Sequence, residues 1–168
     1  MPLVCSGRST TCTIQRQTSN LGTTNSAIAI WEPDTGQARV LSNSEGDRLT
    51  PSVVMFDTQM NQHIVGKSAL DCITSHPSQV IYSVKRFMGC TFRDERVRID
   101  QTQVTYTIAE VQESKVAVCI GKEIFTPPQI SAQILRKLKE DAEATLIFVP
   151  FQVLNISLSL QRLRLRSN

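Results

Sequence analysis

Short apolar runs occur between residues 27 and 56, and they predict β-strands. Residues 27–31 and 38–41 are two such runs, and they flank residues 32–37, where the order Pro-Asp-Thr-Gly favours a turn. We therefore expect the two runs to form a β-hairpin. Residues 53–56 form a third apolar run and predict a further strand.

Apolar residues recur at helical spacing after Ser78, which can cap the start of a helix. The positions concerned are Val80, Ile81, Val84, Phe87 and Met88. Gly89 can end the segment. The pattern predicts an amphipathic helix between Ser78 and Gly89.

A second helix has the strongest start signal in the chain. Thr126 and Gln129 have the spacing of a capping box, and Pro127 occupies the first helical position. The apolar stripe that follows consists of Ile130, Ile134, Leu135, Leu138 and Ala142. The other face pairs Arg136 with Glu140, Lys137 with Asp141 and Lys139 with Glu143. We expect this charged face to be solvated.

Three β-rich segments lie between the two predicted helices. Residues 104–111, 115–120 and 123–125 contain alternating or β-branched patterns around Gly121 and predict a small antiparallel sheet. Strands and helices together predict a mixed α/β (α+β) fold class.

Composition describes a globular chain whose ends differ from its middle. The 168 residues are 40% hydrophobic and 20% charged, and no apolar run is long enough for a membrane span. All 15 acidic residues lie between Glu32 and Glu143. Five cysteines without a C-x-x-C pair, and two histidines, make a metal site improbable, and the odd cysteine count favours a reducing compartment. Cytoplasm is the expected location, with an organelle as the alternative.

The two ends carry little that predicts ordered structure. Residues 1–19 lack an apolar signal sequence and are expected to form an atypical, disordered leader. Residues 145–168 form a divergent basic tail, in which an alternating strand pattern precedes Arg162, Arg164 and Arg166. We expect this tail to be disordered or prone to aggregation, with no binding to nucleic acid or membrane.

Residues 22–25 are the first candidate for chemistry. Gly22 allows the backbone to approach an anion closely, and the amides and hydroxyls of Thr23 and Thr24 can donate hydrogen bonds to phosphate. An ordinary turn between two strands explains the same residues.

Lys85 is the second candidate, and two other motifs are rejected. Lys85 lies on the border of the apolar stripe that begins at Val80, so its ammonium could point along the surface into a cleft, although a snorkelling lysine has the same pattern. Gly66-Lys67-Ser68 resembles the end of a Walker loop, but Asn61 stands where the first glycine is needed. His63 and His76 have no nucleophile motif near them.

Several motifs occur together in one order. They are LGTTNS at 21–26, NSEGDRLTPSVV at 43–54, VG at 65–66, SVKRFMG at 83–89, ISA at 130–132 and LKEDAEA at 138–144. In order and spacing, residues 20–144 resemble the start of the ATPase domain of the seventy-kilodalton heat-shock chaperones of the DnaK type. The resemblance implies a partial actin/hexokinase-like ATPase fold, first lobe only, with an outer subdomain at about 54–127.

The resemblance also implies ligands and roles for particular residues. Gly22, Thr23, Thr24 and Asn25 match the loop that grips the phosphates of ATP, and Lys85 matches the catalytic lysine that reaches the γ-phosphate. The family uses magnesium with ATP, responds to heat shock and other stress, and works on unfolded polypeptides with co-chaperones.

Two departures from the family pattern concern the same loop. Asn20 stands where the family has an aspartate that holds the magnesium shell, so this chain is expected to supply no metal ligand there. Residues 14–19 are polar, and the sequence therefore predicts that the apolar strand before the loop is missing.

Three hypotheses about function follow. The first is the ATP-binding portion of a DnaK-type chaperone that assists protein folding through ATP hydrolysis, here an incomplete fragment that is inactive alone. The second is a protein-interaction module that ignores nucleotide. The third is a non-functional gene remnant whose two ends result from frame errors.

Overall fold

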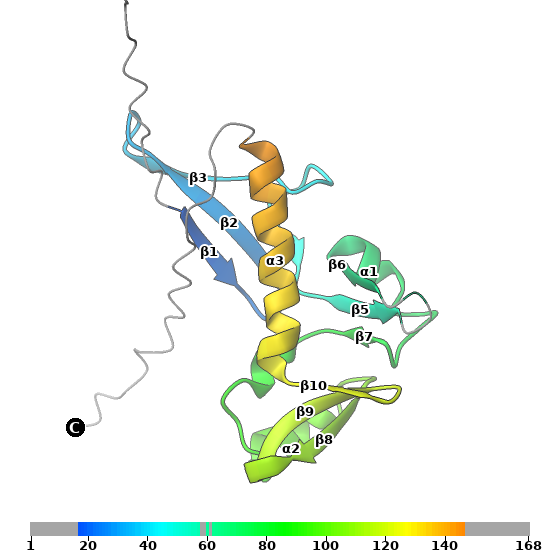
Figure 1. Ribbon diagram of the computed structural model, residues 1–168. Helices are drawn as coiled ribbons and strands as arrows, with labels where there is room; N and C mark the ends of the chain where they lie inside the picture. The colour runs from blue at the N-terminus through cyan, green and yellow to red at the C-terminus, as the bar shows by residue number, and fades with distance from the viewer. Residues whose placement is uncertain (1–16, 58–59, 61, 147–168) are drawn as a thin grey trace, which may run out of the picture.

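A computed structural model describes residues 17–57, 60 and 62–146. The predicted leader up to residue 16 and the strand and arginine patterns beyond residue 146 lie outside these residues. Within them, three small β-sheets and three α-helices give the mixed α/β class that the sequence predicts (Figure 1). None of the described helices is both long and apolar enough to cross a membrane.

The first sheet contains the predicted hairpin. Strands β1 (Gln17–Leu21), β2 (Asn25–Glu32) and β3 (Gln37–Val40) pair antiparallel in that order, and β4 (Thr50–Pro51) also pairs with β2. Gly36 adopts a φ of 64° in the turn between β2 and β3, a conformation that glycine reaches without strain. The hairpin prediction is confirmed.

The second sheet is short and lies beside the middle of the long helix. It has the order β6-β5-β7, with β5 at Val54–Asp57, β6 at Gln62–Val65 and β7 at Val80–Ile81. Helix α1 (Lys67–Asp71) follows β6 directly, and its Ala69 packs with Met55 of β5 in a small apolar cluster. The strand predicted at 53–56 is confirmed.

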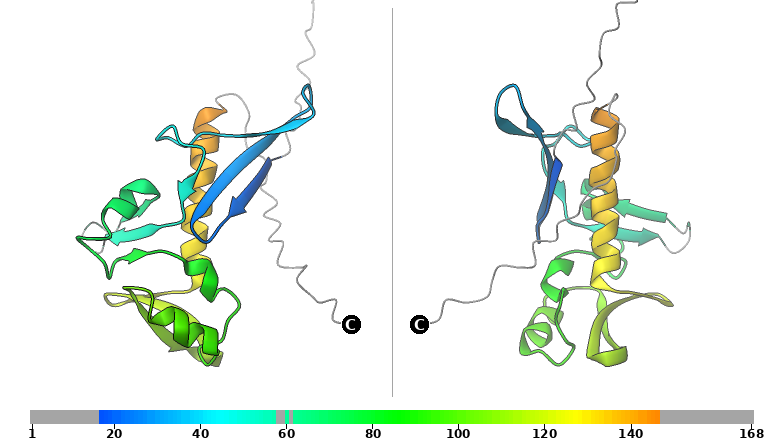
Figure 2. Two further views of the ribbon diagram at one scale, coloured as in Figure 1. Left: turned by 180° about the vertical axis from the view of Figure 1, so that it is seen from behind. Right: turned by 60° about the vertical axis from the view of Figure 1, so that its left-hand side comes forward.

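The third sheet and helix α2 form one end of the molecule. Strands β8 (Thr107–Val111), β9 (Lys115–Ile120) and β10 (Glu123–Phe125) make an antiparallel meander, which confirms the predicted sheet. A short 3₁₀ turn, η2 (Gln112–Ser114), joins β8 to β9. Helix α2 (Glu95–Gln101) lies beside this sheet (Figures 1 and 2).

Helix α3 (Pro127–Thr145) runs past all three sheets, and its apolar side packs in the hydrophobic core. Its capping box is confirmed, because the Thr126 amide donates to the Gln129 side chain at 2.8 Å. The first half of its apolar stripe, Ile130 and Ile134, belongs to a large cluster formed with the second and third sheets, whereas Leu138 and Ala142 pack on the first sheet. Figure 2 shows the helix standing against the β1–β3 sheet and the shorter strands.

The helix predicted between Ser78 and Gly89 does not form. Val80 and Ile81 instead enter β7 and pair with Met55 and Val54 of β5, and Ser83 adopts a left-handed conformation with φ 55°. A 3₁₀ turn, η1 (Val84–Phe87), follows. The sequence pattern was misleading because two adjacent buried positions suit a strand that is covered on both faces.

The strand expected to be missing before the loop is present. Residues 17–21 form β1 although their side chains are mostly polar, because the main chain pairs with β2 from Gln17↔Ile30 to Leu21↔Ser26. Its last residue, Leu21, packs against the large core cluster and anchors the strand. The prediction that this strand is missing was therefore wrong.

The charged face of α3 is only partly solvated. Lys137 and Lys139 form the expected pairs with Asp141 and Glu143, at 2.5 and 3.5 Å. Asp141, however, is only 5% exposed, and its second carboxylate oxygen has no hydrogen-bond partner among the described residues. Lys137 also donates to Ser44 Oγ at 2.7 Å, so this pair ties the helix to the loop after β3.

Candidate phosphate-binding site

At the first position of the turn between β1 and β2, only a glycine fits. A Cβ atom added at Gly22 would lie 2.1 Å from the carbonyl oxygen of Asn25 and 3.2 Å from its carbonyl carbon. The first distance is far too short for a non-bonded contact, and the second is tighter than most contacts of a Cβ atom. The close approach of the two backbone segments therefore depends on Gly22, as the sequence suggested for a loop that holds an anion.

The far side of the turn is held by β4 and the residue after it. The Ser52 amide donates to the carbonyl oxygen of Thr24 at 2.8 Å, and Asn25 is paired with Pro51 across the sheet. Ser26 and Ser52 are both nearly fully buried, and their hydroxyl oxygens lie 2.8 Å apart. This buried hydrogen bond joins the start of β2 to the residue after β4 and so holds the β2 side of the turn.

The donors of the turn are available to a ligand. Outside the strand ladders, and among the described residues, the amides of Gly22, Thr23 and Thr24 donate to no carbonyl. The Thr24 side chain is exposed and the Thr23 side chain is half-buried, and neither hydroxyl has a hydrogen-bond partner in the described part of the chain. Consecutive free amides and hydroxyls of this kind can surround an anion.

Lys85 reaches this turn from a distant part of the sequence. Val84 and Phe87 are buried at 2% and 1% exposure and anchor the 3₁₀ turn η1, so Lys85 between them faces outward. Its Nζ atom donates to the carbonyl oxygen of Leu21 at 2.8 Å, across 64 residues of sequence. The ammonium thus lies at the residue immediately before Gly22, and an ammonium has two further donors for another ligand.

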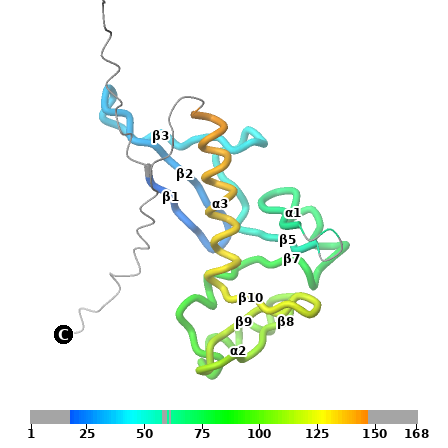
Figure 3. The backbone as a smooth tube through the Cα atoms, in the orientation of Figure 1, coloured from blue at the N-terminus to red at the C-terminus, as the bar shows by residue number. Residues whose placement is uncertain are grey.

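The placement of Lys85 follows from the break in the predicted helix. The left-handed Ser83 turns the chain after β7, and the Arg86 guanidinium donates to Asp100 of α2 at 3.0 Å on the other side of η1. Figure 3 shows the backbone after β7, where it turns beside the start of α3 before it continues to α2. The structure therefore brings together the two candidates that the sequence named separately.

A comparison with known protein families shows to which family the chain belongs. The sequence model of the Hsp70 protein family matches residues 19–149, which is well over half of the chain. The chain belongs to the Hsp70 family. This is a family of chaperones with an ATPase domain, and the three sheets and three helices agree with part of the actin/hexokinase-like ATPase fold of that domain.

The Hsp70 resemblance found in the sequence is thereby confirmed at the level of the family. The matched region includes Gly22, Thr23, Thr24, Asn25 and Lys85. It also includes Ser26 and Ser52, whose buried hydroxyl contact sequence reasoning missed. No spacing rule connects two serines 26 residues apart, although Ser52 stood inside one of the quoted motifs.

Asn20 occupies an exposed position in β1, where it pairs with Ala27 of β2. Hsp70 proteins normally use magnesium with ATP. The described residues contain no group of three or more His, Cys, Asp or Glu side chains that could hold a metal ion. The donors around the turn are amides, hydroxyls and one ammonium, which suit phosphate oxygens better than a divalent cation.

Proposed function

We propose that residues 22–25 and Lys85 bind the phosphates of ATP, and that residues 20–144 are the first lobe of a DnaK-type ATPase domain. The observation that carries this proposal is the 2.8 Å hydrogen bond from Lys85 Nζ to the Leu21 carbonyl oxygen. The positive charge lies beside a turn whose amides, outside the strand ladders, donate to no carbonyl of the described residues. Membership of the Hsp70 family supports a nucleotide as the ligand.

The chemistry of the donors matches phosphoryl transfer. Such transfer depends on donors that are already oriented and on a positive charge near the transferred group, and it needs no nucleophilic side chain. Gly22 and the two threonines would hold the phosphate chain through amides and hydroxyls. Lys85 would contact the terminal phosphate as the catalytic lysine of the domain.

Magnesium would arrive with the nucleotide, and we propose no ligand for it on this chain. Asn20 offers a neutral amide where an aspartate would offer a charge-assisted contact, which is worth about 1.5–3 kcal/mol. The magnesium ion, when bound, neutralises charge on the phosphates. The loss of this contact weakens the metal–nucleotide complex without removing the phosphate donors.

We further propose that residues 20–144 bind nucleotide weakly and do not turn it over alone. Within the described residues, one loop and one lysine face the proposed phosphate position, and no carboxylate stands at the Asn20 position. A dissociation constant near 1 mM corresponds to a binding free energy of about −4 kcal/mol, which a few hydrogen bonds and one charge can supply.

The proposal extends to the division of the chain and to its partners. We propose an outer subdomain at about 54–127, a leader at 1–19 and a basic tail at 145–168, although β1 begins at Gln17 and α3 ends at Thr145. Unfolded polypeptides and co-chaperones would be partners of the intact domain arrangement, in stress responses and in the cytoplasm.

Isothermal titration with Mg-ATP tests this function. We expect weak, near-millimolar binding to the full chain, and loss of that binding in Lys85→Ala and Gly22→Ala. Lys67→Ala is the matched control, because Lys67 is an exposed lysine at the start of α1 and lies outside the turn. Phosphate release should stay at the level of the buffer.

Four results would contradict the proposal. Micromolar affinity that is lost in Lys85→Ala would show that the site is far better formed than Asn20 allows, and measurable ATP turnover would refute inactivity. Equal binding by Lys85→Ala and the unmodified chain would remove Lys85 from the site. Capture of a protein partner that is the same with and without ATP would favour the interaction-module hypothesis instead.

A further inference from the structure

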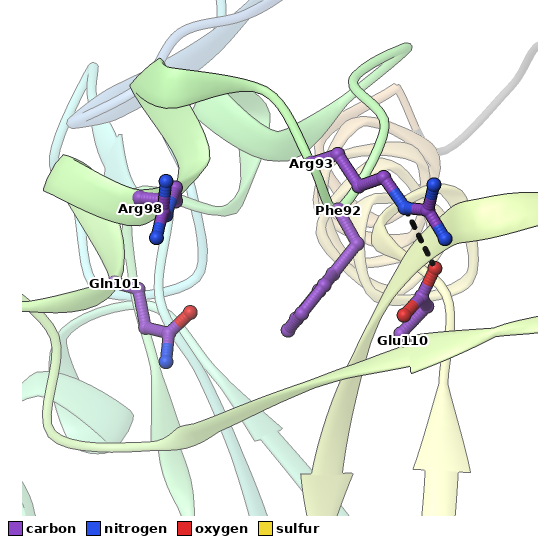
Figure 4. Close-up of a pocket in the computed structure, with 5 residues that line it drawn as sticks. All are labelled: Phe92, Arg93, Arg98, Gln101 and Glu110. Atoms are coloured by element: carbon purple, nitrogen blue, oxygen red, sulfur yellow. Dashed lines mark ion pairs between the residues drawn. The ribbon is translucent and has the colours of Figure 1, made fainter.

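A pocket between α2 and β8 has a lining that the nucleotide site does not use. It has a volume of about 660 Å³ and is lined by Phe92, Arg93, Arg98, Gln101 and Glu110. Figure 4 shows Arg98 and Gln101 on the α2 side, Arg93 and Glu110 on the opposite side, and the Phe92 ring between them. The volume lies within the range of small-molecule sites.

The positive charges in this pocket are only weakly compensated. Arg93 Nε lies 3.9 Å from Glu110 Oε1, which is too long for a hydrogen bond, and the same oxygen already accepts a hydrogen bond from Ser114 Oγ at 2.8 Å. The Arg98 guanidinium has no partner among the described residues. The lining therefore holds two guanidinium groups and one carboxylate, which already accepts a hydrogen bond from Ser114.

A nearby arginine, by contrast, has a carboxylate partner that compensates its charge. Arg86 donates to Asp100 on α2 at 3.0 Å and lies 3.5 Å from the side-chain oxygen of Gln103. Arg98 is on the same helix as Asp100 but lacks such a contact within the described residues. Its free planar fork suits a carboxylate or a phosphate, which it can bind through two parallel hydrogen bonds.

The remaining wall is aromatic and held in place. Phe92 is half-buried and packs against the large core cluster, and its amide donates to the Ser114 carbonyl oxygen at 2.7 Å. One side of the ring is thus fixed by the core while the ring also lines the pocket. A fixed ring between guanidinium groups is a surface on which a flat ligand can stack.

We propose that this α2–β8 pocket is a second binding site, which takes a small aromatic anion: a flat ring that carries a carboxylate or a phosphate. Arg98 binds the oxyanion, Phe92 contacts the ring, and the Gln101 amide offers a further donor. Glu110 lowers the affinity by repulsion. The site shares no residue with residues 22–25 or Lys85.

Nuclear magnetic resonance titration of the full chain with benzoate and with phenyl phosphate tests this site. The two probes separate carboxylate from phosphate recognition. We expect millimolar binding of at least one of them, with amide shifts confined to the residues around Phe92, Arg98 and Glu110. Benzamidine, with the same ring and a positive charge, and acetate, with the charge and no ring, should both bind at least about tenfold more weakly.

Three variants test the separate roles in this pocket. Arg98→Gln should weaken the binding of the probe by about tenfold or more, because it removes a charge-assisted contact. Arg96→Gln on the same helix should change the dissociation constant by less than about twofold. Arg96 is the matched control because it is exposed and does not line the pocket. Glu110→Gln should strengthen binding by about twofold to fivefold, because it removes the repelling charge.

Each of these experiments has a result that would refute the second site. Benzamidine or acetate that binds as well as the aromatic anions, or equal losses in Arg98→Gln and Arg96→Gln, would refute it. Absence of saturable shifts with both anions would refute it as well. Lys85→Ala should leave phenyl phosphate binding here unchanged and Arg98→Gln should leave Mg-ATP binding unchanged, so this proposal and the proposed nucleotide site can fail independently.

Discussion

Two segments of this chain have helical spacing of apolar residues, and only one of them is a helix. Residues 127–145 form the 19-residue helix α3, whereas residues 78–89 divide into β7, a left-handed residue and the 3₁₀ turn η1. The first segment has a capping box and a stripe that is buried along most of its length. The second has adjacent buried residues that pair with β5. Hydrophobic period alone did not separate the two, and the helix forms only in the segment that has a complete capping box.

The difference between the two segments affects the position of Lys85. A continuous helix at 78–89 would fix Lys85 by the helical period, whereas the observed break lets η1 place Lys85 Nζ on the Leu21 carbonyl oxygen. The irregular segment therefore carries the proposed catalytic group, and the regular one supports it. Met88 and Ser131 connect the two segments through an Oγ to Sδ contact at 3.6 Å.

The largest expected effect comes from the anchor of the irregular segment. Phe87→Ala should lower the free energy of unfolding by about 3–5 kcal/mol, because Phe87 is 1% exposed in the large core cluster. Ile134→Ala in α3 is the matched control, because it removes a fully buried side chain from the same cluster at a position outside η1. Chemical denaturation measures both. Phe87→Ala should also weaken Mg-ATP binding more than Ile134→Ala does, and equal binding by the two variants would contradict the anchoring role.

A smaller effect tests the start signal of the regular segment. Thr126→Ala should cost about 1 kcal/mol of stability, because it removes the cap side chain of α3. The shift in the midpoint of chemical denaturation measures this change, provided that the dependence of the unfolding free energy on denaturant keeps the same slope. An equally large cost for Thr102→Ala, at the end of the short helix α2, would show that the cap at Thr126 has no special weight.

The smallest effect tests the left-handed break. Ser83 has φ 55°, a region that costs a residue with a side chain about 1–2 kcal/mol, and glycine loses about 0.5–1 kcal/mol of entropy on folding. Ser83→Gly should therefore raise stability by up to about 1 kcal/mol, whereas Ser83→Ala should not. A loss of stability in Ser83→Gly would mean that the break is not strained in this way.

Much of the fold could be predicted because its signals are local. The hairpin follows from the turn residues ending in Gly36, the third sheet from alternating patterns, and α3 from Thr126 and its stripe. Strands β1 and β7 could not be predicted in the same way. The first is held by main-chain pairing with β2, and the second is set by its neighbour β5, so neither depends on its own side-chain pattern alone.

The candidate site shows the same division. Gly22 was predictable, because a glycine before two threonines suggests close backbone approach, and the structure places the Asn25 carbonyl oxygen where a Cβ would be. The contact of Lys85 with Leu21 was not predictable from spacing, because it joins segments 64 residues apart. The buried Ser26 and Ser52 pair escaped notice for the same reason.

The central claim is that the β1–β2 turn and Lys85 form one phosphate site. The most direct test is a nuclear magnetic resonance titration of the nitrogen-15-labelled full chain with Mg-ATP, repeated on Lys85→Ala. We expect saturable shifts of the amides of Gly22, Thr23 and Thr24 at millimolar nucleotide, and their loss in Lys85→Ala. Shifts that spare these three amides, or that persist unchanged without the Lys85 ammonium, would contradict the claim.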